Sequence, residues 1–133
     1  MQLSTTAIHV GQEPDPTTGA VIPPLYLTST YAQTSPGVHK GYEYTRSGNP
    51  NFTNVEATLA ALENGDYAHI YSSGLGATTT IILSLLNPSD QVIAINDLYG
   101  GTHRLLDKVF SRYGILFKTT DLNDKDIVKF LFA

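Results

Sequence analysis

A ten-residue stretch in the first half of the chain gathers side chains suited to holding a small anion. Residues 41–50 read Gly-Tyr-Glu-Tyr-Thr-Arg-Ser-Gly-Asn-Pro. Arg46 offers a planar, permanently charged fork to a phosphate or carboxylate, and a neighbouring tyrosine adds a hydroxyl donor. This combination of residue types predicts an anion-binding loop.

A second candidate is the glycine-rich segment 71–77, Tyr-Ser-Ser-Gly-Leu-Gly-Ala, which we expect to join a strand to a helix. Glycines let a backbone approach a ligand closely, and a helix start offers unpaired N–H groups. The segment fits a phosphate cup or, equally well, a tight turn. It also half-matches a dinucleotide fingerprint through Gly74, Gly76 and Asp97, but Thr79 at the third glycine position disfavours that interpretation.

The third candidate is the loop 96–104, Asn-Asp-Leu-Tyr-Gly-Gly-Thr-His-Arg. It follows a predicted strand, so in a parallel sheet it lies at the same carboxyl edge as the glycine segment. Tyr99, beside two glycines, is free to stack on a flat heteroaromatic ligand, or else it simply packs on the surface. Asp97, His103 and Arg104 are more simply explained by capping, solvent contact and a salt bridge than by catalysis.

Composition excludes several classes of function. The net charge of −4, without a basic run, argues against nucleic acid as a partner. The chain has no cysteine, and its four histidines lack metal-ligand spacing, so we expect no metal site. The N-terminus does not read as a signal peptide, and the longest apolar run is too short to cross a membrane. We therefore expect a soluble, cytoplasmic protein.

The chain divides near residue 48. Residues 1–48 hold five of the seven prolines and show no sustained helical period. We expect turns at 15–19 and 35–37, an extended run at 21–31, and an arm that packs on a neighbouring subunit. Residues 49–133 alternate between segments with helical spacing and segments that read as strands, which predicts an α/β domain with a parallel sheet. The expected strands are 68–72, 91–96 and 115–119, and the expected helices are 50 to a stop at Gly65, 77–86, 102–113 with Thr102 as N-cap, and one from 124 capped by Asp121 or Asn123.

Several blocks in order resemble the γ-family of pyridoxal-phosphate enzymes of cysteine and methionine metabolism. The blocks are Ala7-Ile-His9 with Gly11, 18–21 with Pro24, 28–31, 42–50, Leu62-Glu63, 72–75, and 97–102 with Arg104. The resemblance spans nearly the whole chain and matches the N-terminal third of that family. It implies the first part of the large domain of a fold type I, aspartate-aminotransferase-like transferase, with helices flanking a parallel-rich sheet and an extended arm in front.

The resemblance also implies roles for individual residues around pyridoxal 5'-phosphate. Tyr44 and Arg46 resemble the pair that reaches the cofactor phosphate of a neighbouring subunit. Gly74 and Leu75 resemble the backbone donors of the phosphate cup. Tyr99 resembles the ring that stacks on the pyridine and helps to position protons. A homo-oligomer, a dimer of dimers with shared active sites, and a sulfur amino-acid substrate are implied in the same way.

Within the family, two positions resemble the branch of cystathionine γ-lyases and γ-synthases, of which we expect the γ-lyase, with the γ-synthase as the alternative. Gly101 stands where methionine γ-lyases place a cysteine, and Tyr99-Gly-Gly-Thr differs from the Tyr-Glu-Pro common in bacterial β-lyases. Glu43 stands where a carboxylate can meet the distal amino group of cystathionine, although it is equally explained as a solvated charge. Residues 77–81 lean slightly toward the lyase.

Two departures from the family pattern qualify the resemblance. The usual Asn-Pro-Thr-Arg is Asn49-Pro-Asn-Phe52 here, a change expected to affect only how the following helix is capped. The family's Schiff-base lysine follows a Ser-x-[Ser/Thr] run, and none of the five lysines here has that context. The aspartate that pairs with the pyridine nitrogen is also absent. We therefore expect the 133 residues alone to be inactive, as part of a longer enzyme or as a non-catalytic, oligomerising remnant.

Overall fold

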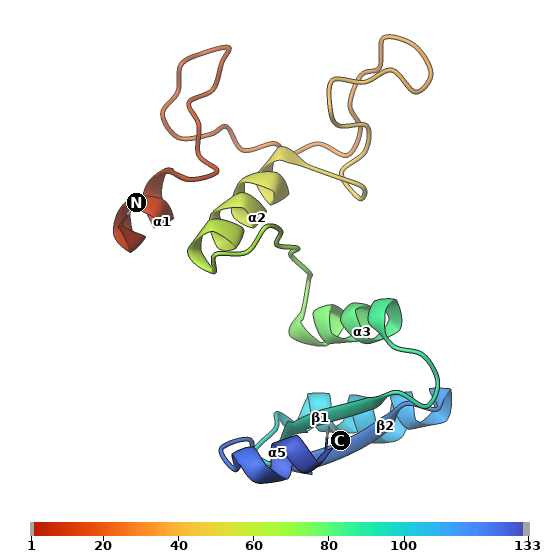
Figure 1. The fold of residues 1–133 in the computed structure, drawn as a ribbon. Coiled ribbons are helices and arrows are strands. Elements are labelled where there is room, and N and C mark those ends of the chain that lie inside the picture. The colour runs from red at the N-terminus through yellow and green to blue at the C-terminus, as the bar shows by residue number, and fades with distance from the viewer. Residues whose placement is uncertain (1, 132–133) are drawn as a thin grey trace. The chain divides into compact units, whose positions relative to one another are not determined.

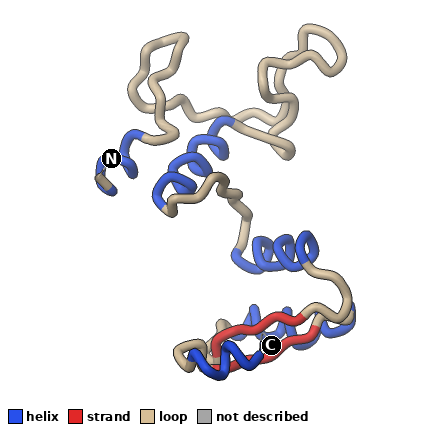
Figure 2. Tube along the Cα trace, in the orientation of Figure 1, coloured by secondary structure: helices blue, strands red, loops and turns tan. Residues whose placement is uncertain are grey.

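The computed structural model describes residues 2–131, whose contacts divide them into two units that join between Ile70 and Tyr71. Figure 1 labels most of the helices and strands of both units, and Figure 2 separates them from the loops. The predicted arm, residues 1–48, lies inside the first unit, and its boundary remains a prediction.

The main element of the first unit is α2, Pro50–Leu62. Asn49 caps it by accepting a hydrogen bond from the Asn51 N–H at 2.8 Å, and Pro50 fills the first turn, where no N–H is needed. The helix ends before Asn64, which is left-handed at φ 54°, and Gly65 N then donates to Ala60 O. The helix predicted from the apolar spacing is therefore confirmed, with its end at Leu62.

A short helix, α1 at Leu3–His9, was not expected in the arm. Seven residues are too few to show a sustained helical period, and tertiary contact stabilises the helix instead. It packs on α2, and Thr58 Oγ1 donates to Val10 O at 2.7 Å just beyond its end. Gly11, at φ +74°, passes so close to α2 that a Cβ there would lie 2.4 Å from Asn54 O.

The remainder of the arm is irregular, as the proline content predicts, and forms the loops drawn in tan in Figure 2. In the turn at 15–19, the Asp15 carboxylate accepts hydrogen bonds from the side chain and N–H of Thr18 and from the N–H of Thr17. These bonds, the Thr18 hydroxyl first, lower the pKa of Asp15 below its ordinary value. The turn at 35–37 is confirmed by the Val38 N–H, which donates to Ser35 O.

The strand expected at 68–72 is wrong. These residues pair with no strand among those the structure describes. Instead, Ile70 N donates to the Glu56 carboxylate at 3.0 Å, so a side chain of α2 satisfies the backbone there. Short apolar runs do not become strands without a neighbour to complete the hydrogen-bond ladder.

The second unit contains α3 at Gly74–Leu85 and two strands, β1 at Gln91–Ile95 and β2 at Leu116–Thr120. The strands are parallel, with Gln91 opposite Leu116 and Ile95 opposite Thr120, which confirms two predicted strands and their direction. Helix α3 begins three residues earlier than expected. Ser73 caps it by accepting from Gly76 N at 3.0 Å, so the glycines form its first turn.

A continuous helical segment crosses from β1 to β2. It comprises α4 at Gly100–Arg104, a π-helical turn η1 at Leu105–Val109 and a 3-10 turn η2 at Phe110–Tyr113. It starts at Gly100, so the expected N-cap at Thr102 is wrong, and it ends at the predicted Gly114, which is left-handed at φ 77°.

The last helix, α5 at Lys125–Leu131, is also capped by a different residue from either that we expected. The Asp124 carboxylate accepts from Asp126 N and Ile127 N, whereas the Asp121 carboxylate is engaged by Asn123. Asp124 stands directly before the first helical residue, which is the position from which a side chain reaches the first-turn N–H groups.

The second unit has its own small core. Phe110 and Leu106 are each 2% exposed, and the His103 ring meets the Phe117 ring of β2 edge-on at 5.4 Å. The buried members are Ile82, Leu106, Phe110 and Ile115, with Leu86, Val92, Leu98, Leu105 and Phe117 packed against them. This core fixes α3 and the crossover helix on the parallel strands. No helix in the described part of the chain is long and apolar enough to span a membrane.

Candidate functional site

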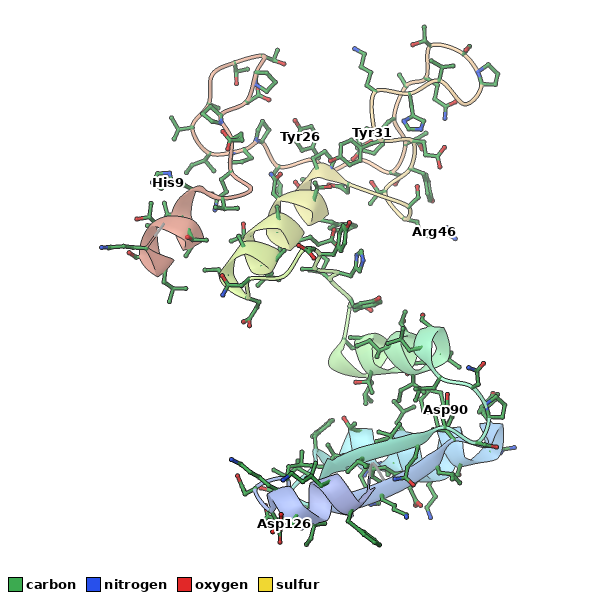
Figure 3. The ribbon with its side chains drawn as sticks, in the orientation of Figure 1. His9, Tyr26, Tyr31, Arg46, Asp90 and Asp126 are labelled. Carbon is green, nitrogen blue, oxygen red and sulfur yellow. The ribbon has the colours of Figure 1, made fainter. Side chains whose placement is uncertain are left out.

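The loop before α2 places Tyr44 and Arg46 side by side. The Arg46 Cζ lies 5.4 Å from the centre of the Tyr44 ring, and its Nη2 lies 3.5 Å from the Tyr44 hydroxyl. A tight turn holds the two residues, since Tyr44 O accepts from the backbone N–H groups of Ser47 and Gly48. Both side chains are exposed, so their donors are available to an anion. Figure 3 shows Arg46 on this loop.

Glu43 precedes this pair. Its backbone carbonyl accepts from Tyr31 N at 3.1 Å, which ties the loop to the extended segment. Its carboxylate is exposed and forms no ion pair or hydrogen bond with another described residue. The carboxylate is therefore free to meet a cationic group.

The first turn of α3 presents an open set of backbone donors. Gly74 N and Leu75 N donate to no described residue, as expected at a helix N-terminus. A Cβ built on Gly74 would meet nothing within 4 Å. The space beside this turn is therefore clear on the side where a side chain would otherwise project.

Tyr99 stands at the N-terminus of α4 and is 72% exposed. Its ring folds back over Gly101, where a Cβ would lie only 2.4 Å from Tyr99 Cε1. By contrast, a Cβ at Gly100 would meet only Arg104 Nη1, at 3.8 Å. The position of the Tyr99 ring thus depends on a glycine two residues later.

The predicted site residues fall into two groups. Glu43, Tyr44 and Arg46 lie together in the first unit. Gly74 and Leu75 begin α3, and Tyr99 begins α4, which contacts α3. That the two groups meet around one ligand remains a prediction.

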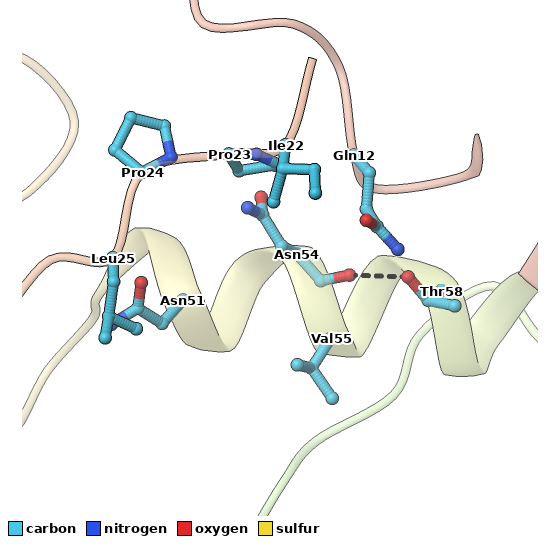
Figure 4. A pocket seen from close by; sticks show the side chains of 9 residues that line it. All are labelled: Gln12, Ile22, Pro23, Pro24, Leu25, Asn51, Asn54, Val55 and Thr58. Atoms are coloured by element: carbon cyan, nitrogen blue, oxygen red, sulfur yellow. Dashed lines mark hydrogen bonds between the residues drawn. The ribbon is translucent and has the colours of Figure 1, made fainter. Parts of the chain in front are cut away.

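Two polar residues near the start of α2, Asn49 and Asn51, have contacts that the sequence does not predict. Asn49 is 2% exposed and donates from Nδ2 to Thr45 Oγ1 and Tyr26 O. Asn51 binds both the N–H and the carbonyl of Tyr26. Figure 4 shows the Asn51 side chain near Leu25, along the apolar groove between α2 and the extended arm. Their signal in the sequence was the Asn49-Pro-Asn run, which we interpreted as capping alone.

Within the described residues, no three side chains of histidine, aspartate or glutamate come together as a metal site. The candidate chemistry therefore rests on Tyr44 and Arg46, on two backbone N–H groups and on one aromatic ring.

The family model for "Cys/Met metabolism PLP-dependent enzyme" matches residues 4–132. A probable cystathionine gamma-synthase of Herpetosiphon aurantiacus is 48% identical over 126 residues, covering 95% of this chain and 39% of the relative. A cystathionine beta-lyase of Coxiella burnetii is 48% identical over 128 residues, covering 96% of this chain and 33% of the relative.

Solved structures agree in fold. The crystal structure of metB from Corynebacterium glutamicum superposes with a TM-score of 0.93 at 42% identity, covering 97% of this chain and 34% of that one. The cystathionine gamma-lyase from Lactobacillus plantarum, complexed with L-serine, gives 0.88 at 42% identity, covering 97% and 33%. The chain thus spans about a third of the length of these proteins. It belongs to the Cys/Met metabolism family of PLP-dependent enzymes.

Proposed function

We propose that the chain is the N-terminal part of a cystathionine γ-lyase-like enzyme, which eliminates at the γ-carbon of cystathionine to give cysteine, 2-oxobutanoate and ammonia. The observation that carries this proposal is the pairing of Tyr44 and Arg46 on the loop before α2. The donors of the two side chains are accessible and matched to a phosphate group.

The residues present fit pyridoxal phosphate. Gly74 leaves open the space beside two free backbone N–H groups, and any larger residue would fill that space with its Cβ. A helix N-terminus with free N–H groups favours a dianionic phosphate. When bound, the cofactor supplies an electron sink next to the α-carbon of the amino-acid substrate.

The roles of the chain's own residues follow from their chemistry. Tyr44 and Arg46 would donate hydrogen bonds to the phosphate from one subunit, and Gly74 N and Leu75 N would donate from another. Tyr99 would stack against the pyridine ring and orient it. The family's oligomeric arrangement, with active sites shared between subunits, would let an exposed Tyr44–Arg46 loop serve a neighbour.

Two features support cystathionine as the substrate. Glu43, next to the phosphate-binding pair, keeps a free carboxylate that suits the distal ammonium group of cystathionine. Gly101 holds no side chain beside Tyr99, unlike the cysteine that methionine γ-lyases carry there. The second candidate is γ-replacement, in which the thiol of cysteine displaces the acyloxy group from the γ-carbon of an activated homoserine ester; the relatives at 48% identity include a probable γ-synthase and a β-lyase alike.

The proposal can be tested with a joined protein. In it, residues 1–133 replace the matching third of the Lactobacillus plantarum cystathionine γ-lyase, and the rest of that enzyme follows. We expect this joined protein to release 2-oxobutanoate from cystathionine, and the 133 residues alone with pyridoxal phosphate to release none. The other outcome is a joined protein that folds, binds the cofactor and forms cystathionine from cysteine and an activated homoserine without acting on cystathionine. That result would favour the γ-synthase.

The Glu43→Gln variant of the joined protein tests the substrate assignment. We expect the KM for cystathionine to rise about tenfold, because one charge-assisted contact is lost. The KM for an S-alkyl homocysteine without a distal amino group should not change. Equal effects on both substrates would remove Glu43 from substrate recognition.

A further inference from the structure

We propose that Asn49 and Asn51 are positioning residues for the phosphate-binding pair. Their amides form a clamp, hereafter the amide clamp, on the peptide groups of Tyr26, and this clamp aligns the loop that carries Tyr44 and Arg46. The inference rests on the proposed function, since it assigns a cause for the placement of that pair.

Asn49 does more than cap α2. Its Oδ1 accepts from Asn51 N, which is the capping interaction, while its Nδ2 donates to Thr45 Oγ1 at 3.1 Å and to Tyr26 O at 3.4 Å. A serine at this position would retain the cap but lose both donated bonds. Asn49 is 2% exposed, and both the oxygen and the nitrogen of its amide find hydrogen-bond partners inside the protein.

Asn51 binds a single residue of the arm at two points. Its Oδ1 accepts from Tyr26 N at 3.1 Å, and its Nδ2 donates to Tyr26 O at 3.0 Å. The side-chain amide thus supplies both bonds that a neighbouring strand would give to this residue. The threonine usual at this position in the family has one hydroxyl and no amide, so it cannot reproduce both bonds. Asn51, which replaces the usual threonine, therefore links the arm to α2.

The clamped segment continues directly into contact with the loop. Two residues beyond Tyr26, the carbonyl of Thr28 accepts from Thr45 Oγ1, and Ser29 O accepts from Thr45 N at 2.8 Å. Thr30 and Tyr44 form an antiparallel bridge. Thr45 is thus fixed by the Asn49 side chain on one side and by the extended segment on the other.

Thr45 lies between the two phosphate-binding residues in the chain. Fixing its backbone and hydroxyl sets the directions in which Tyr44 and Arg46 project, because Thr45 lies in the turn that Tyr44 O closes with Ser47 N and Gly48 N, and both side chains leave that turn. The contact between Arg46 and the Tyr44 ring then forms on a framework that is already ordered. Such ordering before binding reduces the conformational entropy that the ligand must offset.

The first test uses the 133-residue chain itself. Asn51→Thr and Asn49→Ser each remove donated bonds of the clamp and keep the cap of α2. We expect amide NMR shifts of residues 43–47 to move, and the contacts between the Arg46 side chain and the Tyr44 ring to weaken, while the α2 signals keep their helical shifts. The matched control is Asn54→Ser, one turn further along α2. With its oxygen and nitrogen exchanged, the Asn54 amide donates to Gly11 O at 3.2 Å and to Pro50 O at 3.3 Å. Unchanged signals at 43–47 in both clamp variants would overturn the inference.

The second test uses the joined protein and two ligands, pyridoxal phosphate and pyridoxal, which lacks the phosphate. Asn51→Thr should weaken pyridoxal phosphate about fivefold, the equivalent of one hydrogen bond, and leave pyridoxal unchanged. Equal weakening of both ligands would indicate a merely structural role and overturn the inference. Tyr44→Phe and Arg46→Ala separate the two proposals. If these variants also bind pyridoxal phosphate as tightly as the parent, the proposed function fails. If they bind it more weakly but Asn51→Thr does not, only the amide clamp is refuted.

Discussion

The guanidinium group of Arg46 lies over the ring of Tyr44, with 5.4 Å between Cζ and the ring centre and 3.5 Å between Nη2 and the hydroxyl oxygen. The two residues are separated by only Thr45, so a tight turn brings a cation and a phenol to one point on the surface. Under the proposed function, this point would hold the phosphate rather than the reacting carbon atoms.

Substitution of this pair should therefore affect the phosphate selectively. We expect Tyr44→Phe to weaken pyridoxal phosphate about tenfold in the joined protein, because one hydrogen bond to a charged group is lost. Arg46→Lys should weaken it by a similar factor, because lysine cannot offer two parallel donors. Equilibrium titration of both variants with pyridoxal phosphate and with pyridoxal measures the difference. Identical losses for the two ligands would contradict the assignment.

The two glycines after Tyr99 should differ in their tolerance of a side chain. In Gly101→Ala the new Cβ would lie 2.4 Å from the Tyr99 ring and must displace it, whereas in Gly100→Ala the Cβ finds ordinary space. We expect Gly101→Ala to lower kcat/KM for cystathionine about tenfold in the joined protein, as overpacking of this size predicts. Gly100→Ala should remain near the parent value. Equal activities for the two variants would show that the position of the ring does not matter.

Another pair of glycines tests the packing of the arm on α2. Gly11 and Gly19 have nearly the same φ, +74° and +73°, but a Cβ on Gly11 would strike Asn54 O at 2.4 Å and one on Gly19 would meet nothing. Gly19→Ala should reduce the free energy of unfolding by about 1 kcal/mol through backbone strain alone. Gly11→Ala should cost roughly 2–4 kcal/mol, because overpacking adds to the strain. Urea unfolding of both variants of the 133-residue chain measures the difference, and similar costs would place the arm away from α2.

Acid should weaken the turn at 15–19. Hydrogen bonds from Thr18 and Thr17 lower the pKa of Asp15 below its ordinary 3.8, so the folded chain favours the carboxylate more than the unfolded chain does. This stabilisation is fully present above pH 3.8 and is lost as the pH falls through the lowered pKa. The difference in unfolding free energy between the parent and Asp15→Asn should therefore be constant above about pH 4 and shrink below it. A carboxyl ¹³C titration of Asp15 at or above its ordinary value would contradict this prediction.

How much the sequence predicts depends on whether an element is specified locally. Helix α2 follows from Pro50, the apolar spacing and Gly65, and the two parallel strands follow from short apolar runs between clear turns. The segment 68–72 is also a short candidate run before a glycine turn, yet its Ile70 N–H is taken by Glu56, fourteen positions earlier in the chain. Only the fold reveals that competitor.

The candidate site shows the same division. The types of Tyr44, Arg46 and Tyr99 indicate their chemistry in the sequence, and the first turn of α3 holds the predicted glycine and leucine N–H groups. The contacts of Asn49 and Asn51 with Tyr26 span 23 and 25 positions, and no local pattern predicts them. The starts of α3 and α4 were missed by a few residues, because the cap depends on which side chain reaches the first-turn N–H groups.

The most direct measurement is a crystal structure of the joined protein with pyridoxal phosphate bound. We predict hydrogen bonds to the phosphate from the Tyr44 hydroxyl and Arg46 guanidinium of one subunit, and from Gly74 N and Leu75 N of its neighbour, with the Tyr99 ring parallel to the pyridine. A phosphate group bound away from the first turn of α3, or a Tyr99 ring turned away from the pyridine, would contradict the account.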